Sequence, residues 1–349
     1  MSETSLNRST FNRNLLLFIG LSLLLVVMFI LDLLLGSVSI PSSQVIKSMF
    51  GGADNEVWQT IVREFRLPKS ITAVLAGAAL SVSGLQMQTT FRNPLAGPYV
   101  LGISAGASLG VAILVLGITS LGGSLTGLAT SFSLAGAAIL GAMLVLFVIL
   151  AVSVRVKDIM TILILGIMFG SAASALVSVL QYFSSESTLR AFVIWTMGSL
   201  SSVAGMQLKV FAIIIGLGLL LSIVSIRILN VLLLGDSYAK GVGLNLTLSR
   251  ILIFTSTSLL AGGVTAFCGP IGFIGIAVPH VARLIFRTAN HSVLLPGVML
   301  LGSIVLLLGD IIAQLPGFDV TLPINSVAAL LGIPIVIYVV MKNQRFTGI

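Results

Sequence analysis

The sequence predicts an all-α integral membrane protein with about ten transmembrane helices. Of its 349 residues, 57% are hydrophobic and only 8% are charged, whereas a soluble domain carries roughly 25% charged residues. Mean hydropathy is +1.18, and long apolar runs recur between short polar segments. A chain of this composition could not cover a water-exposed surface with polar groups, so we place it in a lipid bilayer.

The charged and metal-ligating residues exclude several other classes of protein. The net charge is +8, but the basic residues form no stripe with interleaved aromatic residues, so we expect no nucleic-acid partner. Cys268 is the only cysteine, and His280 and His291 are the only histidines. We therefore expect no disulfide framework, and no metal or cofactor bound within this chain.

The first apolar run, residues 15–35, is predicted to be a retained anchor behind a polar tail, residues 1–14. It is too long for a signal-peptide core, and no small-residue cleavage site follows it. Residues 36–65 are the longest polar connection, with a short surface helix predicted at 57–65. Pro68 then opens the second membrane helix, where its missing N–H would be unpaired in any case.

Nine further membrane helices are predicted after the anchor, separated by short connections that include a tight turn at 89–98. One additional segment, 189–200, is amphipathic and too short to span. We place it at the outer interface as a half-helix that lines a cavity. The nine predicted membrane helices are 67–87, 100–117, 131–154, 159–182, 207–229, 251–267, 269–285, 293–315 and 323–341.

Two of these helices carry small residues every four positions, which places the residues on one face of each helix. Such a face allows the backbone of a neighbouring helix to approach closely. On the later helix the face is partly polar. The residues are Gly102, Gly106 and Gly110 in the earlier helix, and Gly166, Gly170, Ser174 and Ser178 in the later one.

The segment 235–250, GDSYAKGVGLNLTLSR, is a polar, glycine-broken stretch between two apolar runs. Asp236 or Ser237 can cap a short helix there, and Gly241 and Gly243 can end one in the left-handed region. Two interpretations remain open from these residues. The segment is either an ordinary connection between helices or a protruding docking site that a soluble partner binds.

The distribution of basic residues predicts the orientation. Ten spans put both termini on one side of the membrane. With the termini inside, 12 of the 18 Lys and Arg residues fall on inner segments and the other six fall outside. The outer turns at 117–130, 267–270 and 316–322 contain no Lys or Arg. The positive-inside rule therefore places segment 235–250 and both tails, 1–14 and 342–349, in the cytoplasm.

The sequence lacks the motifs of a self-contained energy source. It has no GxxxxGK[ST] phosphate loop, so ATP is not held here by that motif. Proton-coupled carriers usually place ionisable residues deep in the membrane. Here Asp32 and Asp310 lie near helix ends, and no other acid lies within a predicted span. An ATP-independent secondary carrier or channel is thus the second interpretation.

A remote alternative is an intramembrane hydrolase. Gly102, Ser104 and Gly106 match the letters of a GxSxG nucleophile elbow. The elbow needs a strand-to-helix turn, a histidine base and an acid. The glycines instead follow a helix-packing period, and both histidines lie far along the chain.

Two pairs of basic residues each have two interpretations. His280 and Arg283 lie one helical turn apart at an inner helix end. They either form a structural cluster that satisfies backbone carbonyls or contact the cytoplasmic partner of segment 235–250. Arg66 and Lys69 flank Pro68 at the outer face. They are either interfacial anchors or partners for acidic residues of an extracytoplasmic protein.

Several motifs together match the pattern of one family. The longer ones are RLPK at 66–69, RNPLAGPYVLGISAGASLG at 92–110 and GPIGFIGIAVPHVAR at 269–283; the shorter ones are LLPG at 294–297 and LLGIP at 330–334. In these segments the chain resembles the FecCD family of permeases, the membrane subunits of type II ABC importers for iron–siderophores, haem and vitamin B12. The resemblance covers nearly the whole chain from Arg66 to Met341.

The resemblance implies a ten-helix subunit that pairs with a second permease subunit, most simply as a homodimer, around a central pathway. A cytoplasmic ATPase pair, which holds ATP and Mg²⁺, would dock on segment 235–250. A substrate-binding protein would dock outside, on Arg66 and Lys69. The implied ATPase-facing residues are Gly235, Asp236, Ala239, Lys240, Gly243, Leu244, His280 and Arg283, and the implied pathway or gate residues are Gly166, Gly170, Ser174, Ser178, Trp195 and Gly198.

The chain departs from the family pattern at three positions. Val242 replaces the usual leucine of the inner segment. Gln314 stands where relatives often carry a third basic residue, and Thr321 begins TLPIN where they carry ELP.G. The last two changes lie on the outer side, so the full set of salt bridges to a binding protein is in question.

The implied cargo is a metal chelate, with iron–siderophore first and haem or cobalamin next. The implied location is the bacterial cytoplasmic membrane, and the chain itself is expected not to be an enzyme.

Overall fold

The computed structural model describes residues 3–36, 38–52, 55–117, 131–156, 158–314 and 321–344, and these residues form helices without strands. Residues 118–130 of the predicted outer turn at 117–130, and most of the turn at 316–322, lie outside the described residues, as do residues 345–349 of the predicted tail. In chain order the elements, with η for π-helix, are α1 (Glu3–Leu34), α2 (Ser42–Phe50), α3 (Glu56–Thr60), η1 (Ile61–Arg66), α4 (Leu67–Thr90), α5 (Ile103–Ala112), η2 (Ile113–Gly117), α7 (Ser131–Arg155), α8 (Ile159–Tyr182), α9 (Glu186–Thr196), α10 (Gly205–Val224), α11 (Ile226–Leu232), α12 (Asp236–Gly241), α13 (Leu246–Thr257), η3 (Ser258–Gly262), α14 (Gly263–Cys268), α15 (Ile274–Phe286), α16 (His291–Gln314) and α17 (Ile324–Gln344).

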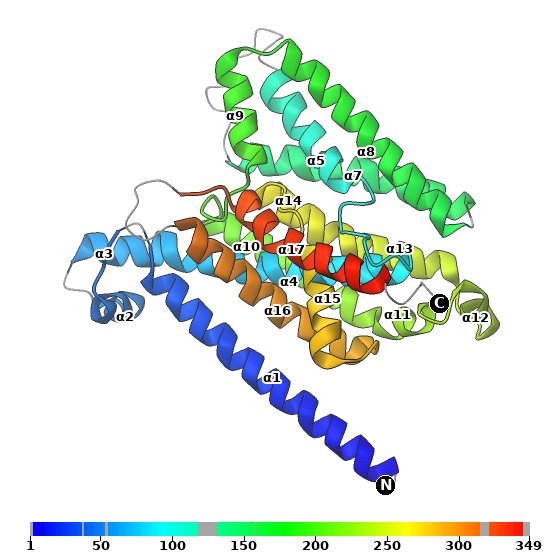
Figure 1. Ribbon diagram of the computed structural model, residues 1–349. Coiled ribbons are helices and arrows are strands. Elements are labelled where there is room, and N and C mark those ends of the chain that lie inside the picture. Colours follow the sequence, from blue (N-terminus) through cyan, green and yellow to red (C-terminus); the bar gives the residue numbers. More distant parts are fainter. Residues whose placement is uncertain are drawn as a thin grey trace.

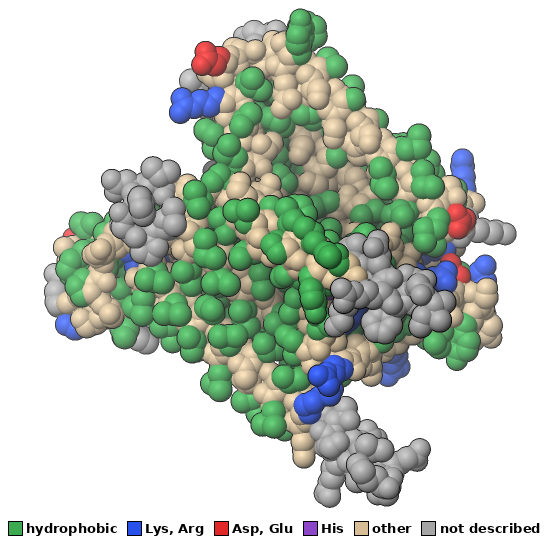
Figure 2. Space-filling view, in the orientation of Figure 1, with side chains coloured by type: hydrophobic (Ala, Val, Ile, Leu, Met, Phe, Trp, Pro, Cys, Tyr) green, Lys and Arg blue, Asp and Glu red, His purple; other side chains and the backbone are tan. Residues whose placement is uncertain are grey.

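The number of membrane helices agrees with the sequence. Among the described residues, seven helices are long and apolar enough to cross a membrane, and three shorter apolar helices lie at 103–117, 274–286 and 324–339. Together they give about ten, so the predicted all-α membrane fold is confirmed. Hydrophobic side chains are spread over the whole face shown in Figure 2, whereas the few Lys and Arg side chains lie near its edges.

The N-terminal third differs from the prediction in three ways. Helix α1 begins at Glu3, so the described part of the predicted tail is helical, which its lack of Gly and Pro permits. Helix α2 is an additional element in the polar connection. Pro68 lies in the first turn of α4, as predicted, but no break precedes that helix, because η1 joins it to α3 and the helical chain runs from Glu56 to Thr90. The i→i+5 bond from Leu67 to Val62 shows the wider turn just before the proline.

Helix α4 is the centre of the fold. Most of its residues are buried, and it packs against α16, α15 and α10. The contacts with α15 and α16 are made by backbone. A Cβ atom added at Gly84 would overlap the carbonyl of Gly275, and one added at Gly77 would overlap that of Gly302. Small residues thus allow the three helices to touch directly.

A buried polar network also holds α4 to α10 and α13. Gln86 Nε2 donates to Ser222 Oγ at 3.2 Å and to Ser256 Oγ at 3.1 Å, and Thr257 Oγ1 donates to Gln86 Oε1 at 3.0 Å. The single helix predicted at 207–229 is interrupted here. Ser225 Oγ bonds back to Ser222 O at 2.8 Å, which favours a local bend, and α10 gives way to α11.

Helices α5, α7, α8 and α9 form a group on one side of the bundle, away from α1 (Figure 1). Within this group α5 packs closely on α7, because Cβ atoms added at Gly106 and Gly110 would overlap carbonyl groups of Gly141 and Ala137. Gly102 contacts α8 instead, at Gly166. Helix α5 starts at Ile103 rather than residue 100, because Gly102 takes a left-handed conformation (φ 75°) just before it.

Candidate functional site

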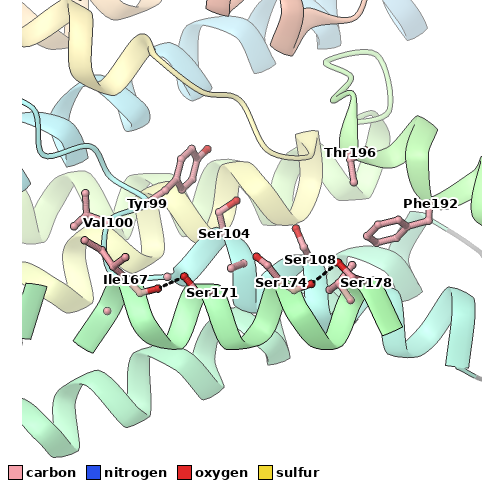
Figure 3. A pocket seen from close by; sticks show the side chains of 15 residues that line it. Tyr99, Val100, Ser104, Ser108, Ile167, Ser171, Ser174, Ser178, Phe192 and Thr196 are labelled. Atoms are coloured by element: carbon pink, nitrogen blue, oxygen red, sulfur yellow. Dashed lines mark hydrogen bonds between the residues drawn. The ribbon is translucent and has the colours of Figure 1, made fainter. Parts of the chain in front are cut away.

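The cavity between α5, α8 and α9 is the first candidate site. It has a volume of about 760 Å³ and is walled mainly by serine and glycine. Figure 3 shows Ser104 and Ser108 of α5 and Ser174 and Ser178 of α8 along the same cavity. The lining residues are Tyr99, Val100, Gly102, Ser104, Ala105, Ser108, Gly166, Ile167, Gly170, Ser171, Ser174, Val177, Ser178, Phe192 and Thr196.

The lining carries hydroxyl groups but no charge. Among the described residues it contains seven hydroxyl-bearing side chains and no Asp, Glu, Lys, Arg or His. The cavity therefore offers hydrogen-bond donors and acceptors to a passing solute without a fixed charge that would hold the solute. All four small residues predicted on α8 (Gly166, Gly170, Ser174 and Ser178) lie on its wall.

Local interactions fix the walls of this cavity. Asp158 caps the start of α8, where its carboxylate accepts bonds from the hydroxyl and backbone N–H of Thr161. These bonds hold the pKa of Asp158 below its ordinary value. At the start of α5, Tyr99 Oη donates to Ile271 O at 3.0 Å and accepts from Ile271 N at 3.3 Å. The loop before α5 is thus tied to the loop before α15.

The predicted half-helix corresponds to α9, which ends at Thr196. Its Phe192 reaches the cavity wall and stacks on Trp195 at 6.1 Å between ring centroids. Gly198 lies in the loop that follows. That loop is fixed at both sides, because Ser199 N donates to Cys268 O at 2.8 Å and Asn325 N donates to Met197 O at 3.3 Å. The end of α9 is therefore attached to the ends of α14 and α17.

A buried polar cluster lies at the predicted outer end of α1, α4 and α16. Lys69 Nζ is 3.0 Å from Asp310 Oδ2, with side chains only 11% and 7% exposed. Gln314 Nε2 donates to Asp310 Oδ2 at 2.8 Å and to Asp32 Oδ1 at 3.2 Å. Ser70 Oγ donates to Asp32 Oδ2 at 2.5 Å. Gln314 therefore joins two acidic residues that are far apart in the sequence.

Arg66 and Lys69, predicted as docking residues, are both buried at this outer end of the bundle. Arg66 is buried and donates to the carbonyl oxygens of Leu33, Leu34 and Val38, so it clamps the end of α1. Lys69 also lines a pocket of about 260 Å³ between α16 and the loop after α9. Their contact with a binding protein stays a prediction, and in this structure both side chains bind their own chain.

We expect Lys69→Met to lower stability by about 3 to 5 kcal/mol, because it leaves a buried carboxylate without its cation. The measurement is the thermal unfolding midpoint of the purified protein. Lys209→Met, which removes an exposed lysine, should leave the midpoint nearly unchanged. The double variant Lys69→Met/Asp310→Leu should recover most of the loss. Equal midpoints for Lys69→Met and Lys209→Met would contradict a stabilising role for the ion pair.

Segment 235–250 forms the short helix α12 and the first turn of α13. Asp236 is not the cap of α12; the cap position is Gly235, and Asp236 pairs with Arg250 at 3.0 Å. Gly241 lies within the helix, whereas Gly243 (φ 84°) ends it. Two bonds close the turn in a Schellman arrangement, from Gly243 N to Lys240 O at 3.0 Å and from Leu244 N to Ala239 O at 2.9 Å. Of the predicted ATPase-facing residues here, Ala239 is fully buried.

His280 binds the loop that follows α4, and Arg283 binds the last turn of α4 itself. His280 Nε2 donates to Pro94 O at 2.8 Å, and Arg283 Nη1 donates to Gln88 Oε1 at 2.6 Å. Gln88 Nε2 in turn donates to Ile276 O at 3.1 Å. These bonds favour the structural interpretation of the pair, since they satisfy polar groups of a non-helical segment in the protein interior.

The hydrolase interpretation finds no catalytic base near Ser104. Ser104 lies on the cavity wall, whose lining includes neither histidine nor acid. His280 is bound to Pro94, and His291 contacts Thr89 and Asn230. Serine, base and acid are therefore not brought together.

Sequence reasoning missed several wall residues and the outer cluster. Ser104 and Ser108 follow the same four-residue spacing as the neighbouring glycines, and that spacing was a usable signal for the α5 side of the cavity. Asp32, Asp310 and Gln314 gave no such signal, because Asp32 is separated from the other two by about 280 positions.

The helical membrane fold and the uncharged cavity define a polytopic membrane permease. The profile of the FecCD transport family matches residues 24–342, so the chain belongs to that family. The chain is 38% identical over 290 residues to the vitamin B12 import system permease protein BtuC of Salmonella typhi, covering 83% of this chain and 84% of that protein. It is 36% identical to BtuC of Salmonella arizonae over 334 residues, covering 95% and 96%.

A solved structure also agrees with the fold. It is described as an inward-facing conformation of a metal-chelate type ABC transporter, with a TM-score of 0.79 and 33% sequence identity. The match covers 93% of this chain and 99% of that chain. The predicted membership of the FecCD family and the predicted fold are both confirmed.

Proposed function

We propose that this chain is the membrane-spanning subunit of an ATP-driven importer that carries a bulky metal chelate into the cytoplasm. The observation that carries the proposal is the uncharged, hydroxyl-lined cavity between α5, α8 and α9 in a fold of the FecCD family. A large solute with polar edges can slide along such a wall without being trapped by charge. The same cavity shows no base or metal ligand that would support catalysis on the cargo.

The cargo is proposed from the relatives. Two of them are vitamin B12 permeases at 36 to 38% identity, and the structural relative is a metal-chelate transporter. These names favour a cobalamin over the iron–siderophore that the sequence placed first, with haem as a further candidate. The wall has few aromatic side chains, so selectivity within this group would come from hydroxyl contacts.

The partners follow from the same proposal. A second copy would complete the pathway, a substrate-binding protein would deliver cargo on the outer side, and an ATPase pair carrying ATP and Mg²⁺ would grip segment 235–250. The positive-inside distribution supports an orientation in a bacterial inner membrane with this segment and both termini on the cytoplasmic side. Closure of the ATPase pair would tilt α11 and α13 through α12, which packs on both.

The direct test is reconstitution in proteoliposomes, with the chain alone and with the ATPase encoded beside it. We expect cobalamin uptake and ATP turnover only in the complex, with both increased by the binding protein. An iron–siderophore serves as the competing cargo. Uptake by the chain alone under an ion gradient would overturn the proposal in favour of a secondary carrier.

The role of segment 235–250 is tested at Gly243. No atom lies within 4 Å of a Cβ atom built there, so a larger side chain would point to solvent or to a partner. We expect Gly243→Trp to abolish most ATP-driven uptake while the protein still assembles, because the left-handed backbone costs only about 1 to 2 kcal/mol. Gly243→Asn is the matched control, since asparagine tolerates this conformation. Full uptake in Gly243→Trp would exclude a docking role.

A further inference from the structure

A second cavity, of about 570 Å³, opens at the end of the bundle that carries α12. It lies beside the last turns of α4 and α15 and beside Tyr338, at the end of the apolar part of α17. Because apolar helices end here together, the cavity is at the level of the bilayer interface. It is separate from the serine-lined cavity, with which it shares no residue.

The charged side chains that line this cavity are cationic. They are Arg283 and the half-exposed Arg92, and no acidic side chain lines the cavity among the residues that the structure describes. Arg283 is fixed by its bond to Gln88, which is itself 3% exposed. Asp236 of α12 lies 3.8 Å from Arg92 and is closer to Arg250, at 3.0 Å. The two guanidinium groups therefore give the cavity a net positive charge.

The rim of the cavity is apolar. Leu233, Leu284 and Tyr338 line it with 40%, 47% and 56% of their surfaces exposed. An apolar rim of this kind can contact the hydrocarbon chains of a lipid. A soluble anion has no apolar part that could make the same contact. The combination of a cationic wall and an apolar rim at the interface is the pattern expected for the headgroup of an acidic lipid.

We propose that this cavity binds the phosphate of an anionic phospholipid, with acyl chains lying against Leu284 and Tyr338. Guanidinium groups bind phosphate oxygens by paired hydrogen bonds, and the half-exposed Arg92 is placed at the mouth to do so. The same Arg92 faces Asp236 of α12, so a bound phosphate would compete with Asp236 for it. The proposal does not depend on the transport activity proposed above.

The test uses the full chain in lipid nanodiscs and a tryptophan reporter on the rim. The chain has two tryptophans, Trp58 and Trp195, which are changed to phenylalanine, and Leu284→Trp adds the reporter. Fluorescence quenching is compared between brominated phosphatidylglycerol and brominated phosphatidylcholine at equal fractions. We expect the anionic lipid to quench more strongly at every fraction.

Arg92→Gln should lower this preference about fivefold, which is the effect of one basic residue near an anionic headgroup. Arg227→Gln, which removes an exposed arginine of α11 outside the cavity, should leave the preference unchanged. Equal quenching by the two lipids, or equal losses in both variants, would overturn the proposal. Loss of the preference on adding inorganic phosphate would assign the cavity to a free anion instead. Absence of quenching by either lipid would show that protein covers the cavity.

Discussion

We expect Gly84→Ala to prevent normal folding of this protein, although it adds a single methyl group. The new Cβ atom would overlap the backbone carbonyl of Gly275, which no side-chain rotation can relieve. Helices α4 and α15 would have to separate, and α15 also carries the bonds from Arg283 to Gln88 of α4 and from His280 to the loop after α4. Overpacking of this kind costs about 3 kcal/mol or more.

The measurement is size-exclusion chromatography of the detergent-solubilised protein, followed by its thermal unfolding midpoint. We expect Gly84→Ala to lose most of the monodisperse peak. Gly216→Ala is the matched control, because nothing lies within 4 Å of a Cβ atom at that glycine of another long membrane helix. A normal peak and midpoint for Gly84→Ala would mean that α4 and α15 are not in backbone contact.

The second large effect is expected at the cavity wall. Ser174→Trp should reduce uptake by at least roughly tenfold, because an indole group would fill the space between α5 and α8 through which the cargo is proposed to pass. The serine side chain is exposed to the cavity, so the substitution should leave the unfolding midpoint close to that of the parent. Uptake of labelled cobalamin in proteoliposomes is the measurement.

Leu176→Trp is the control for this substitution. Leu176 lies on the same helix, is 55% exposed and does not line the cavity, so its replacement should leave uptake nearly unchanged. ATP turnover separates the two steps of transport. If Ser174→Trp retains ATP turnover and loses uptake, the wall lies on the cargo path. Unchanged uptake in Ser174→Trp would place that path elsewhere.

The sequence could predict those parts of the site that depend on the spacing of residues within one helix. Gly170 and Ser174 are four residues apart, so the sequence places them on one face, and both line the cavity. The same reasoning placed the small face of α5 against a neighbouring backbone. Helix periodicity depends only on neighbouring residues, and the bilayer requires long apolar runs. The two small faces could therefore be predicted without knowing how the helices pack.

The polar partners could not be predicted in this way. Arg66 and Lys69 flank a proline at a membrane interface, which made exposed docking residues a reasonable interpretation. Their contacts within the chain, from Arg66 to the end of α1 and from Lys69 to Asp310, were not indicated by the sequence. Likewise, the sequence did not indicate that the amide of Gln314 joins Asp310 to Asp32.

The sequence by itself determined that this is a polytopic helical membrane protein, which segments span the membrane, and which helix faces are small enough for close contact. These follow from hydropathy and period, which are properties of neighbouring residues. Only the tertiary structure decided which polar groups meet, where the cavity lies between α5, α8 and α9, and that His280 holds a loop. Those facts depend on contacts between residues that are far apart in the chain. An unpaired polar group is costly to bury in the membrane, so each buried polar group is found next to a hydrogen-bonding or charged partner.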